Sequence, residues 1–238
     1  MKLFSLLYFV VVLFNPFSGS SPTLPENNIS IIKRGFNKNY PQLSYQLNIS
    51  YPEILDENHE KHYELNLAVQ KIMSAAITDF QGKLQKKGNA SNFGYSYLNL
   101  DYNICRQYHG VLSVKFEKRT FYSGSGLKNP IDLSKTINYD VSRNRFIYIG
   151  DLFKPEVDYS KDLINYINSK YGCKFESPAV LNNFCIESTD LVIIIDDSEK
   201  NQNNKNVCEN EIRIPWIDIE DILDEDNVGY KFLKGIKK

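Results

Sequence analysis

The amino-acid sequence predicts an α+β protein in which two or three helices pack against antiparallel sheets. Several short segments alternate apolar and polar side chains with a period of two, which is typical of strands with one buried face. Two longer segments instead place apolar residues at helical spacing. The chain of 238 residues is also rich in aromatic residues, with 16 Tyr and 14 Phe, and these residue types favour pleated sheets.

The clearest strand pattern lies between residues 110 and 155. Apolar side chains at Leu112, Val114 and Phe116 alternate with the residues between them, which predicts a strand with one buried face. A Gly-rich break at residues 123–126 follows this strand. Two further strands are expected at 136–140 and 146–149, and residues 151–155 close the unit as a turn before a helix. The strand of Leu112, Val114 and Phe116 is expected to span 111–121, and the other expected strands are 44–50, 95–106, 184–186, 190–195 and 211–215.

Three segments are predicted to be helical. Residues 57–84 carry apolar side chains on one face at helical spacing, and Tyr51-Pro52 is expected to turn the chain ahead of them. Residues 159–171 form a second candidate, which Gly172 is expected to end. Residues 216–223 are expected to form a short last helix.

The first 21 residues have the order of a secretory signal peptide. Lys2 precedes an apolar run at residues 3–14, and the small residues 18–20 suit a signal peptidase. The run is shorter than the roughly 20 residues that span a bilayer, so we expect cleavage near Ser21, with a retained anchor as the alternative. No later segment is apolar enough for a transmembrane helix, so we expect a secreted or periplasmic protein.

The remaining chain divides by composition into four parts. Residues 22–41 are rich in Pro, Asn and Ser and are expected to form a flexible arm. Residues 42–92 are predicted to be an N-terminal strand–helix subdomain, and residues 93–225 a larger C-terminal subdomain. Residues 226–238 form a basic tail. The formal net charge of −1 argues against a nucleic-acid partner, which requires clustered basic residues.

The chain contains four cysteines, and an even number in an exported protein favours two disulfides. Of the three possible connectivities we expect Cys173–Cys185 together with Cys105–Cys208. Four free thiols are the alternative. The spacings contain no close Cys pair of the kind that binds zinc, so no metal site is expected.

The candidate catalytic patterns all have a simpler explanation. His59 and His62 lie at a charged helix start without a third ligand, and Asp196-Asp197 has no histidine pattern beside it. Gly124-Ser125-Gly126 lacks the spacing and the following helix of a nucleophile elbow. We therefore predict no catalytic residue, no cofactor and no enzyme activity. Asp151-Leu152-Phe153 is expected to be structural, inserting between sheet and helix.

Several pieces of the sequence together resemble an extracytoplasmic domain family of unknown function. The pieces are residues 112–116, Tyr122-Ser123-Gly124, Asn138-Tyr139-Asp140, residues 151–154, and Tyr51-Pro52 followed by a helix that carries Asn66. The family occurs in the anti-sigma factor RsiV, a lysozyme receptor, and in the non-catalytic N-terminal region of the peptidoglycan deacetylase PdaC. The resemblance covers residues 42–223 and implies an RsiV/PdaC-like fold. One departure is that residues 123–126 replace a Gly-Gly-Ala-His cluster common in the family.

The resemblance implies an exported, non-catalytic binding module whose ligand is a lysozyme-like protein or a glycan. An exposed Gly-rich loop beside aromatic side chains could approach such a ligand closely. The candidate contact residues are Phe121, Tyr122, Ser123, Gly124, Ser125, Gly126 and Asn129. Alternatively, Tyr122 is a core residue and the loop a plain connection. The alternative functions are an uncharacterised cell-envelope hydrolase acting on glycan or peptide, and a purely structural envelope protein.

Overall fold

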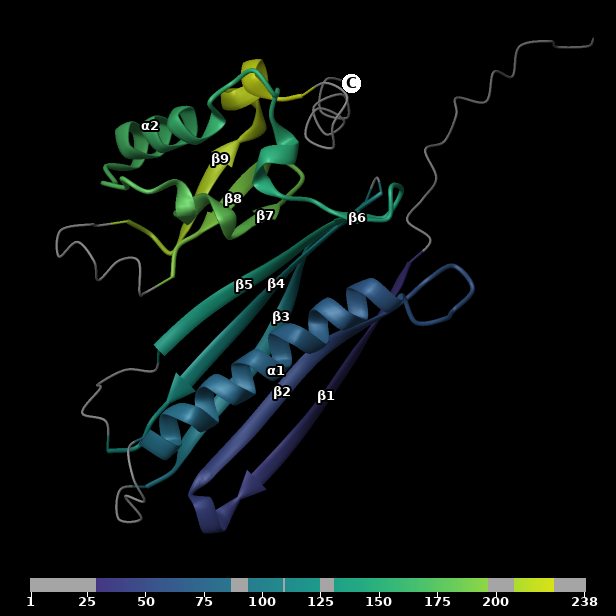
Figure 1. The fold of residues 1–238 in the computed structure, drawn as a ribbon, viewed down its shortest axis with the longest axis vertical. Coiled ribbons are helices and arrows are strands. Elements are labelled where there is room, and N and C mark those ends of the chain that lie inside the picture. Colours follow the sequence, from purple (N-terminus) through teal and green to yellow (C-terminus); the bar gives the residue numbers. More distant parts are fainter. Residues whose placement is uncertain (1–28, 87–93, 109, 125–130, 197–207, 225–238) are drawn as a thin grey trace, which may run out of the picture.

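The computed structural model describes residues 29–86, 94–108, 110–124, 131–196 and 208–224. They form an α+β fold with a six-stranded sheet, a three-stranded sheet and two α-helices, which confirms the predicted fold class (Figure 1). The strands are β1 (Ser30–Tyr40), β2 (Tyr45–Leu55), β3 (Ser96–Tyr108), β4 (Val111–Phe121), β5 (Ile131–Asp140), β6 (Arg145–Phe146), β7 (Phe184–Ile186), β8 (Asp190–Ile194) and β9 (Glu211–Pro215). The helices are α1 (Tyr63–Lys86) and α2 (Tyr159–Tyr171), with short 3₁₀ helices η1 (Pro41–Leu43), η2 (Ile149–Leu152), η3 (Pro178–Asn182) and η4 (Trp216–Ile222).

The larger sheet has the strand order β1-β2-β3-β4-β5-β6. Its neighbouring strands are antiparallel except for β2 and β3, which run parallel. A parallel pair requires a crossover connection, and α1 supplies it by lying across one face of the sheet (Figure 1). The sheet is therefore mostly antiparallel, with one parallel pair that the sequence pattern did not predict.

The expected flexible arm at residues 22–41 is wrong for its second half. Ser30–Tyr40 form β1, which pairs with β2 along its whole length from Ser30↔Leu55 to Tyr40↔Tyr45. Most side chains of β1 are exposed, so this strand lacks the apolar alternation that would have revealed it. Backbone pairing with β2 holds it in the sheet, together with the partly buried side chains Ile31, Phe36 and Tyr40, which pack against the core.

The expected turn at Tyr51-Pro52 is also absent, since both residues lie within β2. β2 pairs with β3 only over Tyr45–Ile49, so Pro52 lies beyond the stretch where β2 has a neighbour on that side. A residue without an N–H group is tolerated where a strand has a free edge.

The long helix begins later than expected, at Tyr63 instead of residue 57. The Asp56 carboxylate accepts hydrogen bonds from the backbone N–H groups of Asn58 (2.9 Å) and Glu60 (3.0 Å), which stabilises a tight turn in place of a first helical turn. The second helix spans Tyr159–Tyr171 as predicted and ends at Gly172, whose φ of 67° suits a glycine C-cap. None of the helices in the described ranges combines the length and apolar character needed to cross a bilayer.

Two hydrophobic clusters lie on opposite sides of the six-stranded sheet. One lies between the sheet and α1 and includes Leu65, Phe80, Leu112 and Phe116, all at most 1% exposed. The other is built around α2 and strands β7 to β9. The six-stranded sheet contains strands from both sides of the subdomain boundary expected at residue 92. The second cluster consists mainly of residues from Ile147 onward.

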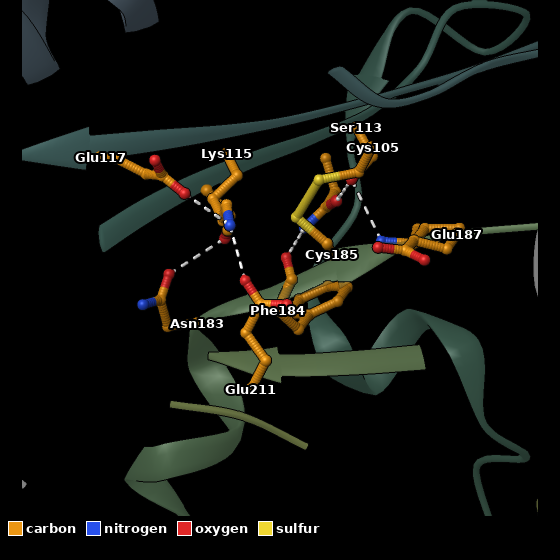
Figure 2. Close-up of a disulfide and its surroundings, with 12 residues drawn as sticks. Cys105, Ser113, Lys115, Glu117, Asn183, Phe184, Cys185, Glu187 and Glu211 are labelled. Atoms are coloured by element: carbon orange, nitrogen blue, oxygen red, sulfur yellow. Dashed lines mark hydrogen bonds and ion pairs between the residues drawn. A yellow bond between two sulfur atoms is a disulfide. The ribbon is translucent and has the colours of Figure 1, made fainter. Parts of the chain in front are cut away.

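Buried polar side chains connect the layer of the second cluster to the six-stranded sheet. Ser113 Oγ donates to Asn138 Oδ1 (2.6 Å) and accepts from the backbone N–H of Ile186 (3.1 Å). Asn138 Nδ2 in turn donates to the carbonyl oxygen of Phe184 (2.8 Å). These side chains hold β7 across β4 and β5 beside a disulfide (Figure 2). The first half of β4 is therefore buried on both faces, not only on the one that its alternation predicts.

The two disulfides are Cys105–Cys185 and Cys173–Cys208. The expected presence of two disulfides is confirmed, but the preferred pairing of Cys173 with Cys185 and of Cys105 with Cys208 is wrong. β7 lies against β3 and β4, so Cys185 reaches the β3 residue Cys105 (Figure 2). Cys173 follows α2 and pairs with Cys208, which precedes β9.

Candidate ligand-binding groove

The described residues of the predicted contact loop lie at the end of β4. Phe121 is half-buried, and its ring stacks on Tyr97 with centroids 5.5 Å apart. The backbone N–H of Ser123 donates to Ser96 Oγ (3.0 Å), and Gly124 has a φ of 70°. Ser125, Gly126 and Asn129 lie outside the described residues. Their role in ligand contact therefore stays a prediction.

Tyr122 is a core residue. Its side chain is 3% exposed, and its ring lies 5.3 Å from that of Phe80 on α1. Burial raises the pKa of Tyr122 to about 12. An enclosed ring of this kind cannot offer its face to a ligand, so the alternative interpretation of Tyr122 is the correct one.

A different surface has the features expected of a binding site. A groove of about 610 Å³ lies between the first half of α1 and the segment from the β5–β6 turn to η2. Its volume falls within the ~300–1,000 Å³ typical of ligand pockets. We call it the tyrosine groove, and its lining residues are Tyr63, Glu64, Leu67, Ala68, Lys71, Asn144, Arg145, Phe146, Tyr148 and Asp151.

The α1 wall of the tyrosine groove is anchored to the sheet by Asn66. The Asn66 side chain accepts from the backbone N–H of Ile54 (3.0 Å) and donates to the carbonyl oxygens of Ile54 (2.7 Å) and His62 (2.8 Å). These three bonds fix the start of α1 against β2. Residues spaced three and four apart, such as Tyr63, Leu67 and Lys71, then share the face that lines the groove.

The opposite wall is a turn followed by a single turn of 3₁₀ helix. Asp140 Oδ1 accepts from the backbone N–H of Arg143 (3.0 Å), and Asn144 adopts the left-handed conformation (φ 52°) that Asn tolerates better than most residues. Asp151 Oδ2 then accepts from the backbone N–H of Tyr148 (2.8 Å) at the start of η2. This wall is therefore positioned by backbone hydrogen bonds.

Tyr139 connects the two walls of the tyrosine groove through its hydroxyl group. Its ring is fully buried and packs edge-on against His62 and Phe146. Its hydroxyl lies 2.7 Å from Asn144 Oδ1 on one wall and 3.1 Å from Glu64 Oε2 on the other. Burial and the adjacent Glu64 carboxylate raise the pKa of Tyr139 above its ordinary value, so the hydroxyl stays protonated and remains a donor.

The rims of the tyrosine groove carry two large exposed rings. Tyr63 on α1 is 76% exposed, and Tyr148 on the opposite wall is 70% exposed. The charged lining residues are two carboxylates, Glu64 and Asp151, and two bases, Lys71 and Arg145, so their formal charges cancel. Arg145 and Asp151 lie 4.0 Å apart. The groove thus offers aromatic faces and many hydrogen-bonding groups without a net charge.

Leu152 and Phe153 are structural, as predicted. Leu152 is fully buried and Phe153 is 2% exposed, and the Phe153 ring stacks on Tyr159 of α2 with centroids 5.0 Å apart. A β-bridge between Phe153 and Leu223 ties the segment to η4. Asp151 accepts a backbone hydrogen bond as expected, but it also lines the tyrosine groove, which the sequence pattern did not indicate.

Among the described residues, four carboxyl groups have lowered pKa values, which is the opposite of what a catalytic acid needs. A glycosidase acid needs a raised pKa to stay protonated. Burial would raise the pKa of Glu211, but its bonds to Lys115 and Arg213 outweigh that effect and lower it. Figure 2 shows the contact with Lys115. The pKa values of Glu53, Asp79 and Asp218 are lowered as well, each beside one or two lysines or arginines. Within the described ranges no three His, Cys, Asp or Glu side chains gather as a metal site would require.

Sequence reasoning missed the tyrosine groove because its walls come from segments about 80 residues apart. One usable signal existed at the second wall, where Phe146 and Tyr148 alternate with the buried Ile147 and Ile149. This pattern places Tyr148 on the outer face. Only the packing of α1 against the sheet brings Tyr63 to the facing rim.

No protein-family model matches the chain. A curated relative, the peptidoglycan-N-acetylmuramic acid deacetylase PdaC of Bacillus subtilis (strain 168), is 24% identical over 99 residues. This match covers 42% of the chain and 21% of PdaC, so the chain matches only about a fifth of the length of that enzyme.

Two solved structures share the fold over most of their length. A DUF3298 family protein from Pseudomonas aeruginosa PAO1 has a TM-score of 0.54 at 11% identity and covers 84% of this chain and 94% of that protein. A member of the same family from Bacteroides fragilis has a TM-score of 0.50 at 12% identity and covers 86% and 96%. The chain therefore has the fold of a domain family of unknown function. The likeness to PdaC is confirmed at this coarse level, and the link to RsiV stays a prediction.

Proposed function

We propose that this chain is an exported, non-catalytic binding module of the cell envelope and that it holds a glycan segment in the tyrosine groove. The observation that carries the proposal is the pair of exposed rings, Tyr63 and Tyr148, on facing rims of one groove. A pyranose ring has apolar C–H faces that stack on aromatic rings. Its hydroxyl groups donate to and accept from amides, carboxylates and guanidinium groups. The tyrosine groove supplies both kinds of contact.

The charge of the tyrosine groove favours an uncharged ligand. Glu64 and Asp151 balance Lys71 and Arg145, so neither an anionic nor a cationic ligand gains a net attraction. The enzyme PdaC is by its name a deacetylase that acts on peptidoglycan, which supports a wall glycan as the ligand class. Two disulfides are consistent with a location outside the cytoplasm. A lysozyme-like protein ligand is the alternative within the same binding role.

The proposal is tested by calorimetric titration of the mature protein with chitin oligomers, soluble peptidoglycan fragments and lysozyme. We expect one saccharide series to bind, without turnover. The double variant Tyr63→Ala/Tyr148→Ala should weaken this binding about tenfold or more, which corresponds to a loss of about 1.4 kcal/mol, because it removes both stacking rings. The variant Tyr95→Ala is the matched control, since Tyr95 is 44% exposed and does not line the groove.

The other outcomes distinguish the alternatives. Unchanged affinity in the double variant would rule out the tyrosine groove as the site. Binding of lysozyme but of no saccharide would favour a protein ligand, as in RsiV. Release of new reducing ends or of acetate from the oligomers would favour the hydrolase alternative.

A further inference from the structure

A second hollow lies further along α1 and differs in chemistry from the tyrosine groove. It has a volume of about 390 Å³ and lies between α1 and strands β3, β4 and β5, beside which α1 runs in Figure 1. Leu100, Phe116 and Leu133 line it from the sheet, and Ile72 and Ala75 line it from the helix. We call it the apolar groove.

The hollow exists because α1 presents small side chains toward this part of the sheet. Ala75 and Ala76 lie above it, and Ala75 is exposed although its neighbours in the hollow are apolar. A longer side chain at this position would fill the space. Ile72 and Leu133 are only half-buried, so together with Ala75 they leave apolar surface accessible to water, which favours occupation by an apolar ligand.

Charges are distributed unevenly along the apolar groove. At the end near residue 79, Asp79 is paired with Lys118 (2.9 Å) and Lys83 (3.0 Å). At the other end lie Lys71 and Lys135, both exposed, and within the described part of the chain neither forms an ion pair. The register of β4 and β5 also places Lys135 at the end of the groove away from Lys118. Lys135 is opposite Phe116, whereas Lys118 is opposite Leu133.

The groove therefore has an apolar floor with a cationic group of two lysines at one end. Asp79 lies eight positions after Lys71 on α1, which corresponds to about 12 Å along the helix axis. The volume is within the ~300–1,000 Å³ of small-ligand pockets. An α-helix with its side chains, at about 10–12 Å in diameter, is a poor match to such a hollow.

We propose that the apolar groove binds a medium-chain fatty carboxylate. The carboxylate lies between Lys71 and Lys135, and the acyl chain runs between Ala75 and Leu133 toward the Lys118–Asp79 pair. A single chain with a compact anionic head suits the volume and the position of the two lysines. This site shares Lys71 with the tyrosine groove but lies further along α1, and the proposal does not rest on the proposed glycan site.

The experiment is a calorimetric titration of the mature protein with octanoate, decanoate and dodecanoate below their micellar concentrations. Affinity is expected to rise about fourfold with each added methylene until the chain reaches the length of the groove. Ala75→Phe should abolish binding, and Ser74→Phe, at the adjacent exposed position on α1, should not. Lys135→Gln should weaken binding of decanoate about two- to fivefold, as expected for an exposed ion pair, and Lys161→Gln, an exposed lysine of α2, should have no effect.

Two results would overturn the proposal. One is decanoate binding that survives Ala75→Phe. The other is 1-decanol or decanoyl lysophosphatidylcholine binding as tightly as decanoate, because the lysines would then contribute no selectivity for a free carboxylate.

Discussion

At the scale of single residues, the segment Leu152-Phe153 shows how burial separates structural from ligand-contacting aromatics. Phe153 is 2% exposed and stacks on Tyr159, whereas Tyr148, five residues earlier, is 70% exposed. The two rings lie in one short segment but face the core and the solvent respectively. Their substitution should therefore have opposite consequences for stability and binding.

We predict that Phe153→Ala lowers the free energy of unfolding by about 3–5 kcal/mol, because it leaves a cavity between the sheet, α2 and η4. Urea denaturation followed by circular dichroism measures the change. Tyr148→Ala is the matched control and should change stability by at most about 0.5 kcal/mol. A loss below about 1 kcal/mol for Phe153→Ala would contradict the structural role of this side chain.

At the scale of elements, the disulfide Cys105–Cys185 and the buried Ser113–Asn138 pair hold the short strand β7 on the larger sheet (Figure 2). β7 has three residues, the lower end of the usual strand length, so its own ladder with β8 supplies few hydrogen bonds. Cross-links from neighbouring elements replace the missing strand length. The second disulfide, Cys173–Cys208, connects the segment after α2 to the segment before β9.

We predict that Cys105→Ala/Cys185→Ala destabilises the protein more than Cys173→Ala/Cys208→Ala. The first disulfide closes a loop of 80 residues and the second a loop of 35, and the chain-entropy relation gives about 4.5 and about 3.8 kcal/mol for loops of these lengths. Urea denaturation of both double variants measures the order. Mapping of the non-reduced protein checks the connectivity, and a peptide linked through Cys173 and Cys185 would contradict it.

At the scale of the whole molecule, ion pairs join elements that are distant in sequence. Lys115 of β4 pairs with Glu211 of β9 (2.6 Å), and Lys118 of β4 pairs with Asp79 of α1 (2.9 Å). Burial alone would raise the pKa values of Glu211 and Asp79, but their lysine and arginine partners outweigh burial and lower both. The contacts of β4 with β9 and with α1 thus both include an ionised carboxylate.

We predict that stability is constant near neutral pH and falls as the pH drops below about 5. A carboxylate whose folded pKa is depressed binds fewer protons in the folded than in the unfolded state, so its contribution is complete above the ordinary values of 4.5 for Glu and 3.8 for Asp and is lost as the pH falls through the folded pKa. Urea midpoints between pH 3 and pH 7 measure this dependence. Glu211→Gln should make it shallower, and an equally steep dependence in this variant would show that the pair does not contribute.

Local patterns predicted most of the elements but few of their partners. The alternation at Leu112, Val114 and Phe116 located β4, and the apolar spacing with Gly172 located α2. The strand β1 was missed because most of its side chains are exposed and its partly buried ones do not alternate, so its pairing with β2 left no pattern in the sequence. Tyr122 was taken for a contact residue because a strand end next to a Gly-rich loop does not reveal which face the helix covers.

The amino-acid sequence by itself determined the α+β class, the presence of two disulfides and the structural role of Leu152 and Phe153, because side-chain period and residue type act over a few neighbouring residues. Only the tertiary structure decided the parallel pairing of β2 with β3, the pairing of Cys105 with Cys185 and the meeting of Tyr63 with Tyr148 in one groove. Each of these joins segments about 50 to 85 residues apart in the chain. Such contacts depend on how whole faces pack, and no local pattern encodes which of several compatible faces will meet.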